Sequence, residues 1–442
     1  MTGTSDRWHQ SLLLGLYRAA FTFAVALFVI IVPLWLFSSK RRATLFKRLG
    51  WQSFPSHSYP RSGKPQQKPV WIHALSIGEL LSAGGLIQRL RAELGNRPLY
   101  LSVSTASAFA MAQDRFARSC DGTFYFPYDV AFAVNRCLDA VDPALIVLIE
   151  TDIWPGFLAE VRRRHIPCCL VNGRLSPESF RTYSRLRLLF EPAFNSFRWI
   201  FPQSPGEAER FFAIGVAPER VRHTGNLKFD VAAALPGVDQ VAALRKEFSI
   251  PADTPMLIAG STHRGEEEII RSCFLRLRRQ FSTLGLIIVP RRPERGTEVL
   301  ELFRGREIEA ALASQVNGST PVIVVDRMGY LSRLYALADV AVIGGSFVPQ
   351  GGQNPIEPAA WGKPVLFGPD MHDFPDVAAW LLKAGGAMQA RDEQELFSAC
   401  NRLLSDPHEA RVMGERARSV VVDHQGATER VTQDLVNLAA GS

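Results

Sequence analysis

Short apolar runs that alternate with longer amphipathic stretches are the feature that most restricts the fold of this chain. Each run has the length of a strand, and the stretches between the runs have the length and apolar spacing of helices. Parallel strands need a crossover connection, usually a helix, so this alternation predicts doubly wound α/β sheets. The predicted strands are residues 70–75, 99–103, 122–126, 144–149, 167–171 and 199–202 in a first series, and 256–259, 286–289, 322–325, 340–343 and 365–367 in a second.

Two domains are predicted, because the two series of strands are separated by a segment with Ala, Pro and Gly at residues 225–239. The first domain covers residues 49–228 and the second covers residues 229–442. Open α/β sheets bind ligands at the carboxyl ends of their strands, so two Rossmann-like domains are expected to face a common cleft. Long helices are predicted over residues 79–94 and 409–440.

The N-terminal segment, residues 1–48, is predicted to be a membrane anchor. Residues 19–37 are uncharged and apolar, and as a helix they would measure about 28 Å, which just spans a bilayer core. Arg18 and Pro33 are also compatible with a shallower, tilted insertion. By the positive-inside rule, the basic residues after the run keep the rest of the chain in the cytoplasm. These basic residues are Lys40, Arg41, Arg42, Lys47 and Arg48.

The composition favours anionic partners and a reducing compartment. The net charge of +7 suits phosphates, anionic lipid or nucleic acid, and charge alone does not choose among them. The six cysteines form no C-x-x-C pair and no spacing typical of metal ligands with histidine, so they are expected to be reduced and mostly buried. No pair of carboxylates with metal-chelating spacing is present, and we predict no metal and no cofactor.

A glycine-rich loop follows the predicted strand at residues 340–343. The strand ends at Gly344 and Gly345, and a second glycine pair precedes Asn354, which is a strong helix N-cap. A helix is therefore predicted to begin at Pro355, and its free N–H groups make an anion site. Glu357 in the first turn can accept hydrogen bonds from a ribose. Alternatively, the glycines only make turns and Glu357 only complements the helix dipole.

The end of the first strand carries a candidate catalytic carboxylate. Glu79 follows the strand at residues 70–75 and can take a proton from an acceptor hydroxyl. The pair Ser76 and Glu79 also matches a capping box, in which the two side chains only satisfy the helix N-terminus. The local sequence leaves both interpretations open.

Further candidate residues follow strands of the second domain. Arg291, Arg292 and Arg295 lie directly after residues 286–289, and guanidinium groups suit phosphate and carboxylate. Met328 and Gly329 follow residues 322–325, where the glycine permits close approach of a base or ribose. The segment 260–265 lacks the Lys-Ser/Thr pair of a P-loop.

Eight sequence blocks in this order resemble the 3-deoxy-D-manno-octulosonic acid (Kdo) transferases of lipopolysaccharide biosynthesis. The resemblance covers nearly the whole chain, and the blocks together are far more specific than any one of them. They are W-I-H-A-L-S-I-G-E (71–79), F-P-Y-D (126–129), E-T-D-I-W-P (150–155), V-N-G-R-L-S (171–176), G-N-L-K-F-D (225–230), S-T-H-R-G-E-E-E (261–268), P-R-R-P-E-R (290–295) and G-G-S-F-V-P-Q-G-G-Q-N-P-I-E-P (344–358).

The resemblance implies a GT-B glycosyltransferase at the cytoplasmic face of the inner membrane, with its last helix crossing back onto the first domain. It would transfer Kdo from CMP-Kdo to a lipid A precursor with inversion, without metal or nucleic acid, and with Glu79 as general base. Ser76, Gly78 and Lys228 would bind the acceptor. The residues that would bind the nucleotide sugar are Ser261, Thr262, Arg291, Arg292, Met328, Gly329, Gly344, Gly345, Ser346, Gln353, Asn354 and Glu357.

The chain departs from the family pattern at four places, three of them toward the donor. The usual G-G-H-N carries Gln353, P-R-H-P carries Arg292 in place of histidine, and M-G-E ends in Tyr330. A threonine-rich loop is replaced by S-V-S-T-A-S at residues 102–107. Two alternatives therefore stay open, a GT-B glycosyltransferase with a different nucleotide sugar or acceptor and a non-catalytic, membrane-tethered paralogue.

Overall fold

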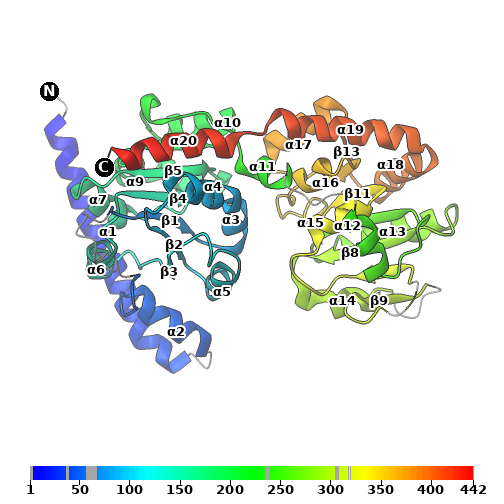
Figure 1. The fold of residues 1–442 in the computed structure, drawn as a ribbon, viewed down its shortest axis with the longest axis horizontal. Coiled ribbons are helices and arrows are strands. Elements are labelled where there is room, and N and C mark those ends of the chain that lie inside the picture. The colour runs from blue at the N-terminus through cyan, green and yellow to red at the C-terminus, as the bar shows by residue number, and fades with distance from the viewer. Residues whose placement is uncertain are drawn as a thin grey trace. The chain divides into compact units, whose positions relative to one another are not determined.

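The chain forms two compact α/β units, which Figure 1 shows in ribbon form. The computed structural model describes residues 3–35, 39–55, 67–233, 239–303, 308–316, 318 and 320–441. The first unit consists of Met1–Asp230 together with Gly426–Ser442, and the second is Val231–Gln425. The last helix, α20 (Ala427–Ala440), thus belongs to the first unit, where it packs on α4 (Gly84–Leu94).

The sheet of the first unit has six parallel strands in the order β3-β2-β1-β4-β5-β6. Alternate residues of β1 point to opposite faces of this sheet. Val70 and Ile72 pack under the helices that include α4 and α20, whereas Trp71 packs on the other face with Phe157. The strands are β1 (Val70–Ala74), β2 (Leu99–Val103), β3 (Gly122–Tyr125), β4 (Leu145–Ile149), β5 (Cys168–Gly173) and β6 (Trp199–Pro202).

The helices of the first unit differ from the predicted ones at two points. The helix predicted over residues 79–94 is broken at Ala83, which caps both α3 and α4, and the helix predicted over 409–440 is broken at Gly426, which has a φ of 88°. The other helices are α1 (Gly3–Trp35), α2 (Ser39–Arg48), α3 (Ile77–Ser82), α5 (Ala106–Arg115), α6 (Ala131–Val141), α7 (Pro155–Arg163), α8 (Pro177–Arg185), α9 (Arg187–Phe194), α10 (Pro205–Ala213), the 3₁₀ turn η1 (Pro218–Arg220) and α11 (Leu227–Ala233).

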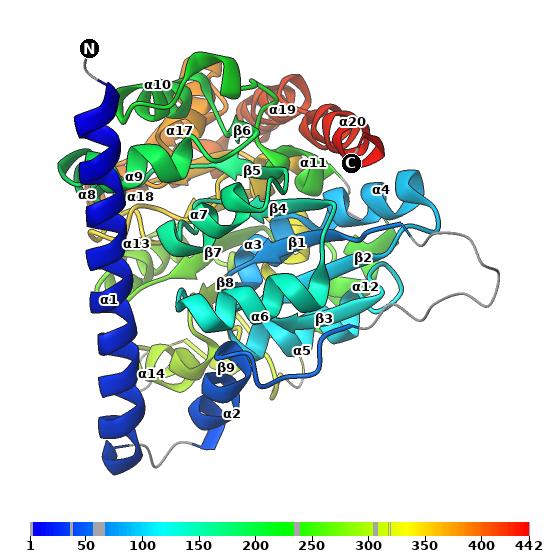
Figure 2. The same cartoon turned by 90° about the vertical axis from the view of Figure 1, so that its left-hand side faces the viewer.

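Helix α1 packs against α7 and α9 of the first unit, as Figure 2 shows. Tyr17 Oη donates a hydrogen bond of 2.8 Å to Asp129 Oδ2, and Arg18 Nη2 donates one of 3.1 Å to the carbonyl of Gly156. The ring of Phe21 meets that of Trp154 edge to face. Part of α1 is therefore integrated into the α/β unit, which the sequence did not indicate.

The membrane-spanning helix predicted at residues 19–37 is not found. In the part of the chain that the structure describes, no helix combines the length and the apolar character needed to cross a bilayer. The last two residues of the predicted run lie outside the described residues.

The sheet of the second unit has seven parallel strands in the order β13-β12-β11-β7-β8-β10-β9. The two outermost strands, β9 and β13, were not predicted. Together the two sheets confirm the prediction of two Rossmann-like domains. The strands are β7 (Met256–Thr262), β8 (Gly285–Pro290), β9 (Ala310–Leu312), β10 (Val322–Val324), β11 (Val340–Ile343), β12 (Val365–Phe367) and β13 (Ala387–Gln389).

The helices of the second unit cover both faces of this sheet (Figure 1). The helix predicted to begin at Pro355 begins one residue later, with Pro355 at its N-cap position. The helical segments are α12 (Asp239–Glu247), α13 (Glu267–Arg278), η2 (Pro293–Arg295), α14 (Gly296–Glu301), α15 (Leu331–Leu334), η3 (Tyr335–Leu337), α16 (Ile356–Ala360), α17 (Pro375–Ala384), α18 (Glu393–Ser405) and α19 (Pro407–Asp423).

All six cysteines are free thiols in buried positions. Each lies in the core of one of the two units. This confirms the prediction of reduced, mostly buried cysteines.

Candidate active site

A polar pocket of about 150 Å³ lies at the carboxyl ends of β1, β4 and β5 in the first unit. This is the edge at which open α/β sheets bind ligands. Glu79 is part of the pocket wall, as are two further carboxylates and one arginine. The lining residues are Leu75, Glu79, Glu150, Thr151, Asp152, Arg174, Ser176 and Ser179.

Glu79 has the contacts of a helix cap and at the same time faces this pocket. Its backbone N–H donates to Ser76 Oγ at 3.4 Å, as in a capping box. Its carboxylate accepts a 2.6 Å hydrogen bond from the N–H of Leu75 and a 3.3 Å bond from the Ser76 hydroxyl. The capping geometry is therefore real, and it fixes the carboxylate at the pocket wall, so the two interpretations are compatible.

The pKa of the Glu79 carboxyl is raised from 4.5 to about 8. Burial is the largest cause, because it disfavours the charged form, and the negative charge of Glu150 is the second. The hydrogen bond from Leu75 acts in the opposite direction, and Asp152 raises the pKa further. A carboxyl with a pKa near the working pH is suited to proton transfer.

The other two carboxylates of the pocket have cationic or imidazole partners. Glu150 forms an ion pair of 3.0 Å with Lys228, and its own φ is +58°, a left-handed conformation that is uncommon for glutamate. Asp152 Oδ2 lies 3.1 Å from Nε2 of the fully buried His73. Among the described residues, Glu79 forms no such pair.

A buried hydrogen-bond chain holds His73 in place. The Trp71 indole N–H donates to Ser102 Oγ at 2.7 Å, and Ser102 Oγ lies 2.9 Å from His73 Nδ1. Nδ1 also lies 3.1 Å from the carbonyl oxygen of Ser102, so Ser102 holds one side of the ring and Asp152 the other. Sequence reasoning did not single out His73, which lies within β1, or Asp152, which follows β4.

The acceptor-binding residues predicted from the sequence lie around the same pocket. Ser76 caps α3, and Gly78 is in the first turn of that helix. A Cβ on Gly78 would meet only Ser76 Oγ at 3.9 Å, so packing does not require glycine there. Lys228 is positioned by its backbone N–H, which donates to Asn226 Oδ1 at 2.9 Å.

In the second unit, the glycine-rich loop after β11 is folded around a buried carboxylate. Glu266 accepts hydrogen bonds from the N–H groups of Gly345 (2.5 Å), His263 (2.7 Å) and Phe347 (3.3 Å). A Cβ on Gly344 would collide with the carbonyl oxygen of Ser261. The glycines therefore permit close packing within the loop, and the N–H groups of Gly345 and Phe347 are bound inside the protein by Glu266.

Three of the predicted donor-site residues support the fold of the protein itself. Two of them form hydrogen bonds inside the protein, and the third turns the chain. Ser346 is fully buried, and its hydroxyl donates to the carbonyl of Ile343 at 2.6 Å and accepts from the N–H of Gly368 at 2.7 Å. The Thr262 hydroxyl donates to the buried Glu267 at 3.2 Å. Ser261 has a φ of +57°, which turns the chain at the end of β7.

The remaining predicted donor-site residues are more accessible. The Asn354 side chain accepts from the N–H of Ile356 at 3.1 Å and donates to Glu357 Oε1 at 3.3 Å, so it orients the carboxylate predicted to meet the ribose. Met328 is 57% exposed, and a Cβ on Gly329 would meet no atom within 4 Å. Gln353 is half-buried beside Gly345.

Arg291 and Arg292 are exposed at the carboxyl end of β8. Neither guanidinium group forms a hydrogen bond or ion pair with another described residue. Arg295 differs, because it pairs with Glu267 at 2.7 Å and with Glu298. The structure thus leaves two of the three arginines available for an anionic ligand.

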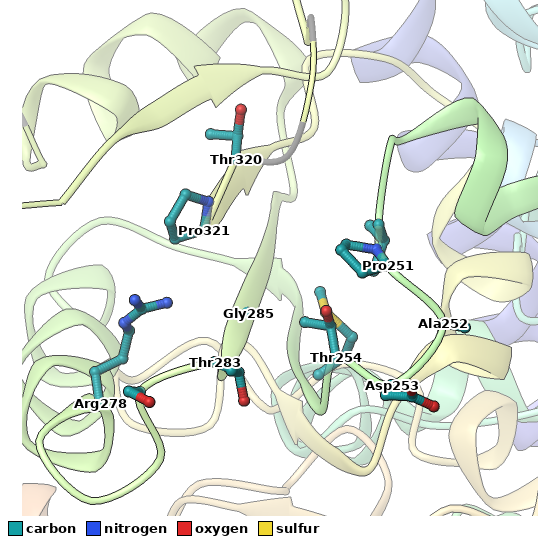
Figure 3. A pocket seen from close by; sticks show the side chains of 12 residues that line it. Pro251, Ala252, Asp253, Thr254, Arg278, Thr283, Gly285, Thr320 and Pro321 are labelled. Carbon is teal, nitrogen blue, oxygen red and sulfur yellow. The ribbon is translucent and has the colours of Figure 1, made fainter.

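A larger cavity of about 400 Å³ lies at the opposite edge of the second sheet. Figure 3 shows the side chains that line it, among them Asp253, Thr254, Arg278 and Thr320. Met256 and Gly285 place it at the amino ends of β7 and β8. None of the residues predicted from the sequence lines this cavity, and volume alone does not make it the candidate site.

Comparison with known proteins gives one consistent family. A family model described as 3-deoxy-D-manno-octulosonic-acid transferase matches residues 43–231. A 3-deoxy-D-manno-octulosonic acid transferase of Bordetella pertussis is 32% identical over 95% of this chain and 98% of its own length. The enzyme of the same name from Haemophilus influenzae is 29% identical over 89% of this chain and 91% of its own length.

The fold is also shared with solved structures of low sequence identity. UDP-GlcNAc 2-epimerase from Neisseria meningitidis, solved with UDP-GlcNAc bound, has a TM-score of 0.58. It is 13% identical and covers 85% of this chain and 100% of its own. At that identity the likeness shows only the two-domain α/β fold.

Proposed function

The chain belongs to the Kdo transferase family and is a glycosyltransferase, and we propose that it transfers Kdo from CMP-Kdo to a lipid A precursor with inversion of the anomeric centre. The observation that carries this proposal is the Glu79 carboxyl, held in a polar pocket with its pKa raised to about 8. A base of that strength takes a proton from a sugar hydroxyl more readily than an ordinary carboxylate does.

In the proposed reaction, ionised Glu79 accepts the proton of the acceptor hydroxyl as the oxygen attacks the anomeric carbon of Kdo. The new C–O bond forms while the bond from that carbon to the phosphate oxygen of CMP breaks. The electron pair of the broken bond leaves with CMP, whose added negative charge calls for fixed positive groups. Arg291 and Arg292, which have no ion-pair partner among the described residues, are cations of the second unit that suit this role.

Glu79 is preferred over the neighbouring carboxylates because of their partners. Glu150 is neutralised by Lys228, and Asp152 is bonded to His73. The negative charges of Glu150 and Asp152 both raise the pKa of Glu79. Their proposed role is to keep Glu79 basic and to bind hydroxyl groups of the acceptor.

The proposed location is the cytoplasmic face of the inner membrane, with the N-terminal segment as the attachment. The motivation is the lipid acceptor, the basic residues that include Lys47 and Arg48, and an aromatic cluster at the start of the first unit. In this cluster, Phe46, Trp51 and Phe132 are 53%, 56% and 50% exposed, and Trp51 lies 6.1 and 5.9 Å from the other two rings. Exposed aromatic rings beside basic residues are typical of membrane interfaces.

The test is an assay with CMP-Kdo generated in place and a tetraacyl lipid A precursor as acceptor. Glu79→Gln preserves the size and hydrogen bonding of the side chain and removes the base, so activity should fall by roughly 10²–10⁴-fold while CMP binding is retained. Glu93→Gln is the control, because Glu93 is an exposed glutamate on α4 of the same unit. It should leave activity unchanged.

Two outcomes would change the proposal. Full activity of the Glu79→Gln variant would remove this residue from the mechanism and leave it as a helix cap. Transfer by the wild-type chain from another nucleotide sugar, with none from CMP-Kdo, would retain the glycosyltransferase and replace the donor. Vesicle flotation of the wild-type chain tests the location, and failure to float with anionic vesicles would contradict it.

A further inference from the structure

A buried imidazole nitrogen without a partner lies beside the glycine-rich loop of the second unit. His263 follows β7, and its Nε2 is shielded from solvent with no hydrogen-bond partner in the described part of the chain. Buried polar atoms of this kind are rare, because each one costs free energy unless a ligand, an ion or water satisfies it. The His263 Nε2 atom therefore calls for a partner.

The position of this ring is fixed from two sides. The backbone N–H of His263 donates to Glu266, which also holds the N–H of Gly345. A Cβ on Gly345 would lie 3.4 Å from Cδ2 of His263 and 3.5 Å from Cγ of Gln353. The imidazole and the Gln353 side chain thus flank the same glycine of the loop.

The charged groups around His263 favour an anion. Three cations lie near the ring, namely Arg291, Arg292 and Arg295. Two anions are also close: Glu267, and Glu266, which accepts the backbone N–H of His263. Glu267 is neutralised by Arg295, and Glu266 accepts hydrogen bonds from three N–H groups. Arg291 and Arg292, in contrast, have no acceptor among the residues that the structure describes. The excess charge near the ring is therefore positive.

We propose that His263 is a ligand of the nucleotide-sugar site, where its Nε2–H and the guanidinium groups of Arg291 and Arg292 bind one anionic group of the donor. This inference rests on the proposed function. The anionic group is the phosphate or the sugar carboxylate, both of which present the same acceptor oxygens. His263 was not among the residues selected from the sequence, because its unsatisfied nitrogen is visible only in three dimensions.

Binding of an anion at this place has a measurable consequence. Without ligand, burial is the main cause that lowers the pKa of His263, and Arg291 lowers it further, with Glu267 opposing. The ring is therefore neutral near pH 7. An anion bound to Nε2–H favours the charged imidazole, so the second ring nitrogen takes up a proton as the ligand binds.

The experiment is isothermal titration calorimetry of the full-length chain with CMP at pH 7. Repeating the titration in buffers of different ionisation enthalpy gives the number of protons that the complex takes up on binding. The phosphate of CMP titrates near pH 6 itself, so the informative quantity is the difference between wild type and His263→Gln. Glutamine keeps an N–H donor and cannot take up the proton. The variant should bind CMP with a proton uptake smaller by up to about one proton per site.

Two further variants test whether the effect on CMP binding belongs to His263. His263→Leu removes the donor and should weaken binding by about tenfold, the effect of one hydrogen bond to a charged group. His408→Gln is the control, because His408 is an exposed histidine on α19 of the same unit, and it should leave proton count and affinity unchanged. Cytidine lacks the phosphate, and free Kdo offers only the carboxylate, so these two ligands identify the anionic group.

The outcomes separate this inference from the function on which it rests. A proton difference with CMP assigns His263 to the phosphate, and a difference only with Kdo assigns it to the carboxylate. If wild type binds CMP or Kdo and both His263 variants match it in proton count and affinity, the inference is refuted and the proposed function stands. If wild type binds neither ligand, the proposed donor is refuted together with the inference.

Discussion

Replacing Glu79 by glutamine should stabilise the first unit, and the gain should grow with pH. The pKa of Glu79 is raised in the folded chain, from 4.5 to about 8. The contribution of the protonated Glu79 carboxyl to the free energy of unfolding is therefore fully present below pH 4.5. This contribution is lost as the pH rises through about 8. Glutamine does not titrate, and it can still accept the hydrogen bond from Leu75. The variant consequently escapes this loss.

The magnitude follows from the difference between the two pKa values. From 4.5 to about 8, at about 1.4 kcal/mol for each pH unit, the upper bound is about 5 kcal/mol. The pocket is open to solvent, which screens the charge, so a gain of about 2–4 kcal/mol at pH 8.5 relative to pH 4.5 is expected. Above pH 8.5 the gain should be constant.

Hydrogen exchange of the full-length chain, read by mass spectrometry on peptides that cover β1 and β4, reports the opening free energy of this unit alone. Wild type and variant are compared at the same pH, so intrinsic exchange rates cancel. Glu93→Gln, which removes an exposed carboxylate, should show no gain that depends on pH. A difference between wild type and Glu79→Gln that is equal at pH 5 and pH 8.5 would refute the argument that burial raises this pKa.

Three further predictions concern other parts of the chain. Tyr17→Phe should lower the stability of the first unit by about 1–3 kcal/mol in thermal unfolding, because the buried Asp129 loses a donor; an unchanged transition would mean that α1 does not pack there in solution. Glu357→Gln should weaken CMP binding by about 1–3 kcal/mol in titration calorimetry if its carboxylate meets the ribose, and equal affinity would remove it from the site. Asp230→Ala should lower the protection of α20 in hydrogen exchange by about 1–2 kcal/mol, because Asp230 accepts hydrogen bonds of 2.6 Å from the N–H groups of Gly426 and Thr428. Unaltered protection would contradict this capping role.

The central strands were predictable because they are continuous apolar runs that are buried on both faces. Leu99–Val103, Val340–Ile343 and Val365–Phe367 have the predicted bounds. Ala310–Leu312 and Ala387–Gln389 were missed because they are edge strands of three residues with partly exposed side chains. Their pairing is decided by the neighbouring strand and leaves no pattern of its own.

The residues of the candidate site were predictable only where a local motif carries them. Glu79 stands out because a strand, a serine and a glutamate at cap spacing follow one another. The contact of His73 with Asp152 joins residues far apart in the chain, and so does the contact of Glu266 with Gly345. No local signal in the sequence shows that Glu266 accepts hydrogen bonds from the N–H groups of this loop.

The return of α20 to the first unit has a consequence for biosynthesis. This helix supplies Val431, Leu435 and Ala439 to the core cluster that also contains Val70 and Ile72 of β1. All six strands of the first sheet leave the ribosome before the second unit is made, and the helix that completes their core leaves last. One apolar face of the nascent first unit is therefore incompletely covered throughout synthesis of residues 231–425, and a chain that stops anywhere in that interval keeps it so.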